Sequence, residues 1–190
     1  MIYPIVAYGA TVLRKKCDDI KKGELDVKQI SENMFETMYA ASGVGLAGPQ
    51  VNLPYRIFIA DGEVINKSAE SEEEIDEDLI GFKKTFINAH IIEETGTPWA
   101  YEEGCLSIPG IRADVMRKPV ITIRYFDTDW VEHTETYKGM AARIIQHEYD
   151  HIEGILFTDY MAPLKKQMLK KKLGQIQKGI VDADYKMKFI

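Results

Sequence analysis

Apolar positions recur at helical spacing in three stretches of the chain. The first stretch predicts a helix over about 27–41, and its apolar positions are Val27, Ile30, Met34, Met38 and Ala41. This helix is expected to stop at Ser42-Gly43. The two later stretches predict a helix over about 138–153, closed by Gly154, and another over about 163–180.

Runs typical of strands lie between the first and second of these helices. They cover 56–60, 84–94, 118–126 and 131–137, and Asp127–Trp130 joins the last two as a hairpin. Strands and helices do not alternate regularly, which favours an α+β fold. We expect antiparallel β-sheets packed around a central helix, with an N-terminal helix and a C-terminal helix.

Length, charge and cysteine content narrow the class of protein. The chain has 190 residues and a formal net charge of −6, which predicts one domain over 1–190 and argues against DNA binding. Its two cysteines, Cys17 and Cys105, do not suggest a disulfide framework. The N-terminus lacks the basic region of a signal peptide, and no stretch reaches the ~20 apolar residues of a membrane span. These features predict a cytoplasmic protein with no membrane partner.

A strongly acidic segment covers about 68–78, between the first two predicted strands. Its sequence, SAESEEEIDED, predicts a solvated surface loop. A calcium loop is the alternative, but the segment lacks the glycine and the ligand spacing that such loops have.

The sequence QHEYDH at 146–151 carries the strongest chemical signal. His147 and His151 lie four residues apart, so both imidazoles can reach one metal ion from the same face of the predicted central helix. Glu148 is rotated away by about 100° and can act on a metal-bound water, which is why H-E-x-x-H is typical of metal hydrolases. The alternative is an ordinary amphipathic helix. Met140 and Ile144 share the histidine stripe, however, and buried unpaired imidazoles would be costly.

A tetrahedral catalytic site needs a third protein ligand. No histidine follows His151, and Glu153 is too close on the same helix, so the candidates are His90, His133 and Cys105. Asp150 could anchor the helix or be a plain surface carboxylate. A third segment, GVGLAGPQ at 43–50, is dense in glycine and lets the backbone approach a ligand closely, although a structural turn is the ordinary interpretation.

Three motifs together resemble those of the peptide deformylase family. They are GVGLAGPQ at 43–50, EGCLS at 103–107 and QHEYDH at 146–151, and the resemblance extends over about 1–165. Two features depart from the family pattern. Gly48 stands where many members carry Ala, a change expected to be harmless, and 68–78 resembles a local insertion.

The resemblance implies a metal site and a mechanism. Cys105, His147 and His151 would bind one metal ion, whose hydroxide would attack a formyl carbon with Glu148 as general acid and base. Gln50 and the backbone N–H of Leu106 would stabilise the developing oxyanion. Fe²⁺ is the metal that the family uses in cells, and purified protein can hold Zn²⁺ or Ni²⁺ instead.

The resemblance also implies a substrate, the N-terminal formylmethionine of nascent peptides, and a bacterial cytoplasmic location. Gly45 would contact the substrate backbone, Val44 and Ile144 would line the methionine pocket, and Glu103 and Arg112 would lie at the cleft edge. Two other classes of function stay open: an H-E-x-x-H metallopeptidase, and a non-catalytic binding module stabilised by metal.

The predicted C-terminal helix is basic on one face. Its apolar stripe, which we expect to pack on the domain, consists of Leu169, Leu173, Ile176 and Ile180. The lysine face is ordinarily just solvated. The resemblance adds a second hypothesis, in which clustered lysines contact ribosomal RNA phosphates.

Overall fold

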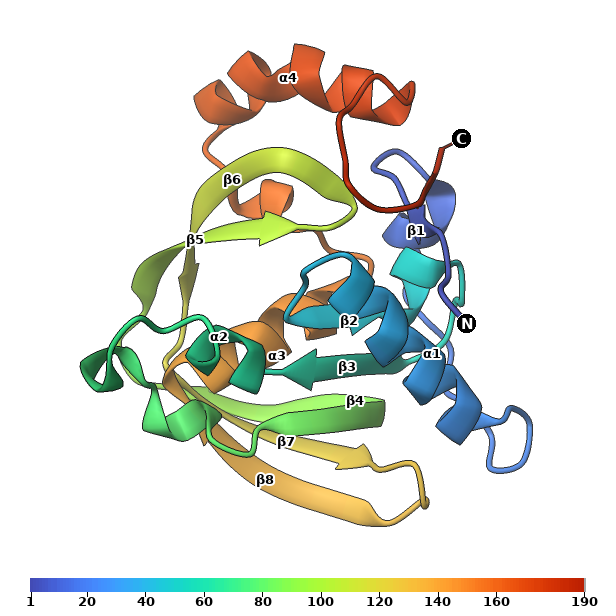
Figure 1. The fold of residues 1–190 in the computed structure, drawn as a ribbon, viewed down its shortest axis with the longest axis vertical. Helices are drawn as coiled ribbons and strands as arrows, with labels where there is room; N and C mark the ends of the chain where they lie inside the picture. The colour runs from blue at the N-terminus through green and yellow to red at the C-terminus, as the bar shows by residue number, and fades with distance from the viewer. Residues whose placement is uncertain (190) are drawn as a thin grey trace.

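A five-stranded antiparallel sheet forms the largest layer of the fold in the computed structural model, which describes residues 1–189 (Figure 1). Its strand order is β2-β3-β4-β7-β8. The strands are β2 (Gly45–Ala47), β3 (Ile57–Asp61), β4 (Lys83–Thr95), β7 (Val120–Phe126) and β8 (Glu132–Lys138). Four of these five strands are those predicted from sequence, to within two residues at each end.

Successive residues of β3 face opposite sides of this sheet, as the two-residue period of a strand requires. Phe58 and Ala60 belong to the core cluster that contains α3 (Gly139–Ile152). Ile57 and Ile59 belong to the cluster that contains α1 (Val27–Ala40). A helix therefore covers each face of the sheet at β3, and this explains why β3 is apolar throughout.

The second layer is a long hairpin of β5 (Trp99–Cys105) and β6 (Ile108–Arg117), which sequence analysis did not predict. Figure 1 shows α3 running between this hairpin and the five-stranded sheet. From Ile111 onward, every second residue of β6 is buried, and Ile111, Ala113 and Val115 belong to one core cluster on that face of the hairpin. The central helix and both terminal helices are confirmed, and the α+β fold with them.

The two ends of the chain meet beside each other. β1 (Ile5–Val6) and β9 (Met187–Lys188) form a short parallel pair. The helix that precedes β9 in the sequence, α4 (Pro163–Gln177), packs on β6 through Leu173 and Ile176. The expectation for Ile180 was wrong: the helix ends at Gln177, and Ile180 is 62% exposed. Short 3₁₀ turns cover Thr11–Arg14, Gly48–Val51 and Phe157–Tyr160.

The acidic segment is mostly exposed, as predicted, but it is not an unstructured loop. It follows α2 (Glu63–Asn66) and contains two 3₁₀ turns, at Glu72–Glu74 and Glu77–Leu79. Leu79 is fully buried in the same core cluster as α3, so it fixes the end of the segment to the protein.

Gly48 is tightly enclosed. A Cβ added there would lie 2.8 Å from the carbonyl oxygen of Leu53 and 2.9 Å from that of Tyr55. Both atoms belong to the backbone and cannot move like a side-chain end. The exchange with Ala, expected to be harmless, therefore requires a backbone shift in this chain.

Phe86 offers a test of the core packing. It is fully buried, and its ring centroid lies 4.7 Å from that of Phe58 and 4.4 Å from that of Tyr125. Phe86→Ala should lower the free energy of unfolding by about 3–5 kcal/mol because it leaves a cavity. Denaturant unfolding measures this, with the exposed Ile92→Ala on the same strand as the control. Equal losses in the two variants would contradict the packing described here.

Candidate active site

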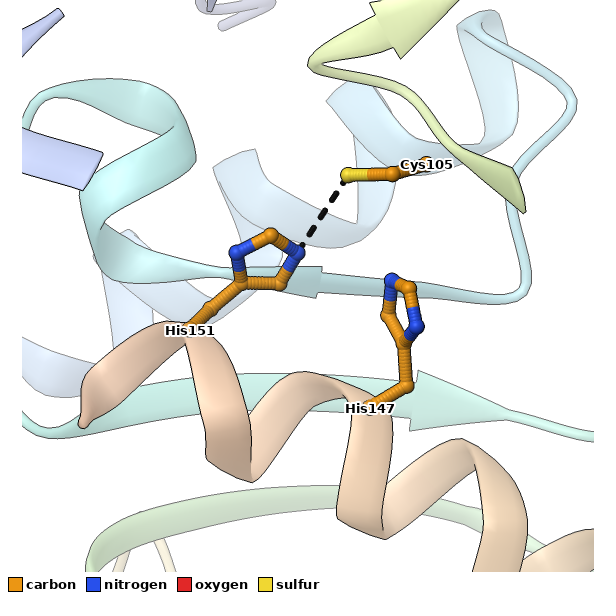
Figure 2. A group of neighbouring side chains, drawn as sticks. All are labelled: Cys105, His147 and His151. Atoms are coloured by element: carbon orange, nitrogen blue, oxygen red, sulfur yellow. Dashed lines mark hydrogen bonds between the residues drawn. The ribbon is translucent and has the colours of Figure 1, made fainter. Parts of the chain in front are cut away.

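Two histidines of α3 and one cysteine of β5 come together between the hairpin and the sheet. The ligand atoms of Cys105, His147 and His151 all lie within 4.8 Å of one another. Figure 2 shows the sulfur of Cys105 above the two imidazoles, with its Sγ 3.3 Å from Nε2 of His151. The other two candidates for a third ligand lie elsewhere. His133 bonds Asp127 at 2.7 Å in the β7–β8 hairpin, and His90 pairs with Arg124 between β4 and β7.

The chemistry of this donor set fits a transition metal. One thiol and two imidazoles are donors that suit Zn²⁺ and Fe²⁺. His151 is buried, and burial lowers the pKa of this imidazole well below its ordinary value, so the ring is in the neutral form that binds metals. Among residues 1–189, Nδ1 of His151 has no hydrogen-bond partner.

A buried carboxylate orients His147. Oε2 of Glu103 lies 2.9 Å from Nδ1 of His147, so the other ring nitrogen, Nε2, is left for a metal. Arg117 donates to both oxygens of Glu103, at 2.7 and 2.9 Å, and Arg143 donates at 2.8 Å. Burial alone would raise the pKa of Glu103, but hydrogen bonds with His147 and Arg117 lower it to about 2.

Glu103 lies in the wall of the cleft, but it is only 5% exposed rather than open at the cleft edge. The resemblance implied a contact with substrate. Instead, its carboxylate is engaged by two arginines and one histidine.

Asp150 belongs to the same network and is not a surface carboxylate. It is buried, and its Oδ2 accepts hydrogen bonds from Arg117 at 2.8 Å and from Tyr160 at 3.0 Å. Arg117 thus pairs with two carboxylates, and these ion pairs compensate for the burial of its positive charge. The carboxylate side chain anchors α3 to β6, which is one of the two roles left open by the sequence.

Glu148 lies beside β2 in a buried position. Burial raises the pKa of its carboxyl to about 7, and its Oε2 has no hydrogen-bond partner among residues 1–189. A Cβ at Gly45 would lie 2.7 Å from Cδ of Glu148, so any other residue at position 45 would displace the carboxylate. A carboxyl with a pKa near neutrality can both accept and donate a proton.

A cleft of about 630 Å³ opens onto these groups. The predicted residues that line it are Val44, Gly45, Gln50, Glu103, Cys105, Leu106, Arg112, Ile144, His147 and Glu148. His151 is buried, and its Nε2 lies 3.3 Å from the Cys105 sulfur. Arg112 is exposed at the rim and pairs with Glu102 at 2.9 Å.

Gln50 is held in one orientation. Its Oε1 accepts a hydrogen bond from the N–H of Ala47 at 2.8 Å, which turns its amide nitrogen toward the Cys105 sulfur, 3.4 Å away. The same nitrogen lies 3.3 Å from Oγ of Ser107. The side-chain amide nitrogen therefore lies between the donor set and Ser107.

Sequence analysis missed Arg117, Arg143 and Tyr185. Arg117 follows Ile111, Ala113 and Val115 at two-residue spacing, so recognition of β6 as a strand would have placed it on the buried face. No local signal marks Arg143 as buried or Tyr185 as a cleft residue, because both depend on contacts between distant parts of the chain.

An H-E-x-x-H helix with a third donor close to its histidines, opening onto a cleft, is the arrangement of a metal-dependent hydrolase. The family model described as polypeptide deformylase matches residues 2–167. The chain belongs to this family.

Curated relatives match over the whole chain. The chain is 58% identical to the peptide deformylase of Cytophaga hutchinsonii. This match covers 100% of this chain and 98% of that protein. Identity to the peptide deformylase of Christiangramia forsetii is 54%, over 100% of this chain and 96% of that one.

Solved structures share the fold. A peptide deformylase from Thermotoga maritima is 34% identical, with a TM-score of 0.73, over 86% of this chain and 99% of that one. Plasmodium falciparum peptide deformylase in complex with an inhibitor is 32% identical, with a TM-score of 0.76. The match covers 92% of this chain and 99% of that one.

The enzyme is a hydrolase that removes the formyl group from the N-terminal formylmethionine of newly made proteins. The family is metal-dependent, and the cluster of Cys105, His147 and His151 is a possible metal site. A metallopeptidase and a non-catalytic binding module are not favoured. Within residues 1–189, none of the helices is both long and apolar enough to cross a membrane.

Glu103→Gln tests the orientation of His147. The substitution removes a charge that holds the imidazole, so metal affinity should fall about tenfold to a hundredfold. Competition with a chelator measures this. Glu102→Gln, which changes the neighbouring exposed carboxylate, should leave the affinity unchanged. Equal metal affinities in the two variants would contradict the role of Glu103.

Proposed function

We propose that Cys105, His147 and His151 hold one divalent metal ion and that Glu148 moves protons during deformylation. The observation that carries this proposal is the cluster of three donor atoms within 4.8 Å, beside a buried carboxyl in the wall of a cleft. Three protein donors leave a position for water, as in catalytic sites. The whole chain, 1–190, would work as one catalytic domain.

The reaction divides into proton transfers and charge stabilisation. A metal ion bound there would act as a Lewis acid and would lower the pKa of the water molecule that it holds. Glu148 accepts one proton from the attacking water as the water oxygen bonds to the formyl carbon. Glu148 then gives this proton to the methionine nitrogen as the carbon–nitrogen bond breaks. The second water proton leaves with the formic acid, which ionises, so the products are formate and a protonated free amine.

Gln50 and Leu106 would stabilise the negative formyl oxygen. The hydrogen bond from Ala47 to Gln50 supports this role, because it turns the amide nitrogen, rather than the amide oxygen, toward the donor set. The backbone N–H of Leu106 comes directly after Cys105. Loss of one such donor typically raises the barrier by about 2.7–4 kcal/mol.

The substrate would lie extended along β2. This strand is at the edge of the five-stranded sheet, so a peptide can add main-chain hydrogen bonds that do not depend on its sequence. Gly45 would contact the peptide backbone, Val44 and Ile144 would receive the methionine side chain, and Arg112 would lie at the outer edge.

We further propose Fe²⁺ as the metal in the cell. The thiol and the two imidazoles suit it, whereas affinity alone ranks Zn²⁺ higher, so purified protein can hold Zn²⁺ or Ni²⁺. A bacterial cytoplasm, where formylated nascent chains are made, is the proposed location, and the bacterial relatives support it.

Glu148→Ala tests the proposed proton transfer. Formate release from formyl-Met-Ala-Ser should fall by at least about a hundredfold, which is the contribution of a positioned acid–base group. Metal content should be retained, since Glu148 is not among the three donors. The control is Glu94→Ala, on the exposed part of β4. Full turnover by Glu148→Ala would disprove the role of this residue.

Ribosome contact is proposed for the lysine face of α4. Lys165, Lys170 and Lys171 are exposed on it, which supports contact with RNA phosphates. Replacing all three by Glu should weaken co-sedimentation with ribosomes and reduce its salt dependence, because fewer counterions are released. Lys15, Lys21 and Lys22, also exposed, are the matched control set. Unchanged co-sedimentation would count against the contact.

A further inference from the structure

The C-terminal segment returns to the active-site cleft after α4. Asp182–Tyr185 line the cleft, and β9 follows immediately. In Figure 1 this red segment leaves α4 and curves down to β1. The N–H groups of Ile5 and Ala7 donate to the carbonyls of Lys186 and Lys188, at 2.8 and 2.9 Å. The segment is thereby fixed next to the cleft by main-chain hydrogen bonds.

Tyr185 contacts the turn that follows Cys105. Its hydroxyl donates to the carbonyl oxygen of Leu106 at 2.7 Å. Tyr185 and Leu106 are both partly buried and pack against the same core cluster, which holds the hydroxyl in place. A side chain from the end of the chain thus reaches the segment between the donor cysteine and β6.

The pairing of β5 with β6 does not fix this turn by itself. The ladder shifts register between Gly104 and Cys105, and Cys105 then pairs with Ile108 across the turn. Leu106 and Ser107 are therefore outside the regular ladder. The N–H of Tyr8 donates to the carbonyl of Ser107 at 2.8 Å, so both ends of the chain hold the turn through consecutive carbonyls.

The carbonyl and the N–H of Leu106 belong to neighbouring peptide planes that share one Cα atom. Each plane is rigid, so only two backbone torsions separate them. A hydrogen bond that fixes the carbonyl restricts the direction of the N–H on the cleft side. Preorganised N–H groups stabilise a developing oxyanion without reorganising during the reaction.

We propose that Tyr185 is a positioning residue for deformylation: its hydroxyl holds the Leu106 carbonyl so that the Leu106 N–H faces the formyl oxygen. This proposal rests on the oxyanion role proposed above for Leu106. It assigns a function to the C-terminal segment, which lies beyond the residues 2–167 matched by the family model.

Tyr185→Phe tests the proposal because it removes only the hydroxyl. On the metal-loaded enzyme, the NMR ¹H–¹⁵N shift of the Leu106 amide should change, because this shift reports the backbone torsions that set the direction of the N–H. The kcat for formyl-Met-Ala-Ser should fall about threefold to tenfold, the usual effect of one neutral hydrogen bond. KM should change less than twofold, because the oxyanion exists only in the transition state.

The control is Tyr55→Phe, a partly buried tyrosine packed against the same cluster. It should change neither the Leu106 amide shift nor kcat. An unchanged Leu106 amide shift in Tyr185→Phe would overturn the positioning role and leave the role of Leu106 intact. A changed shift with unchanged kcat would also overturn the proposal, and would show that the Leu106 N–H is not an oxyanion donor.

Discussion

The buried carboxylate of Glu103 is the interaction on which the rest of the site depends. It binds Arg117 from β6 and both Arg143 and His147 from α3, so it joins the hairpin to the central helix. Cys105 lies two residues further along β5, and the same contacts therefore set its distance from the histidines of α3. Buried charges are costly unless they are paired, and here Arg117 and Arg143 each form an ion pair with Glu103, and Arg117 forms a second one with Asp150.

Close backbone approach is the second constraint on the site. Gly45 brings β2 against the Glu148 carboxylate, where a Cβ would clash. The edge position of β2 then leaves its main chain available to an extended peptide. Tyr185 lines the cleft near the C-terminal end of the chain, and both its hydroxyl and the N–H of Tyr8 donate to carbonyls of the turn after Cys105. Segments distant in sequence thus meet around the Glu148 carboxyl and the three proposed metal donors.

Much of this arrangement was predictable from local spacing. The i, i+4 histidines and the adjacent Glu148 predicted a metal-binding central helix, and the structure brings Cys105 close to both histidines. The apolar periods predicted α1, α3 and four strands of the large sheet, which the structure confirms. The residues alone left three candidates for the third donor, and only the resemblance selected Cys105. The hairpin was missed because Pro109 and Gly110 interrupt the alternation of β6 near its start. Glu103, Arg117 and Arg143 carry charges, and only tertiary contacts show that they are buried.

X-ray absorption at the metal edge of the Zn²⁺-loaded protein tests the central claim most directly. The account predicts one sulfur at about 2.3 Å and two imidazole nitrogens at about 2.0–2.1 Å from the metal. The sulfur should disappear in Cys105→Ser. A metal surrounded only by nitrogen and oxygen in the unsubstituted protein would contradict the assignment of Cys105, His147 and His151 as the site.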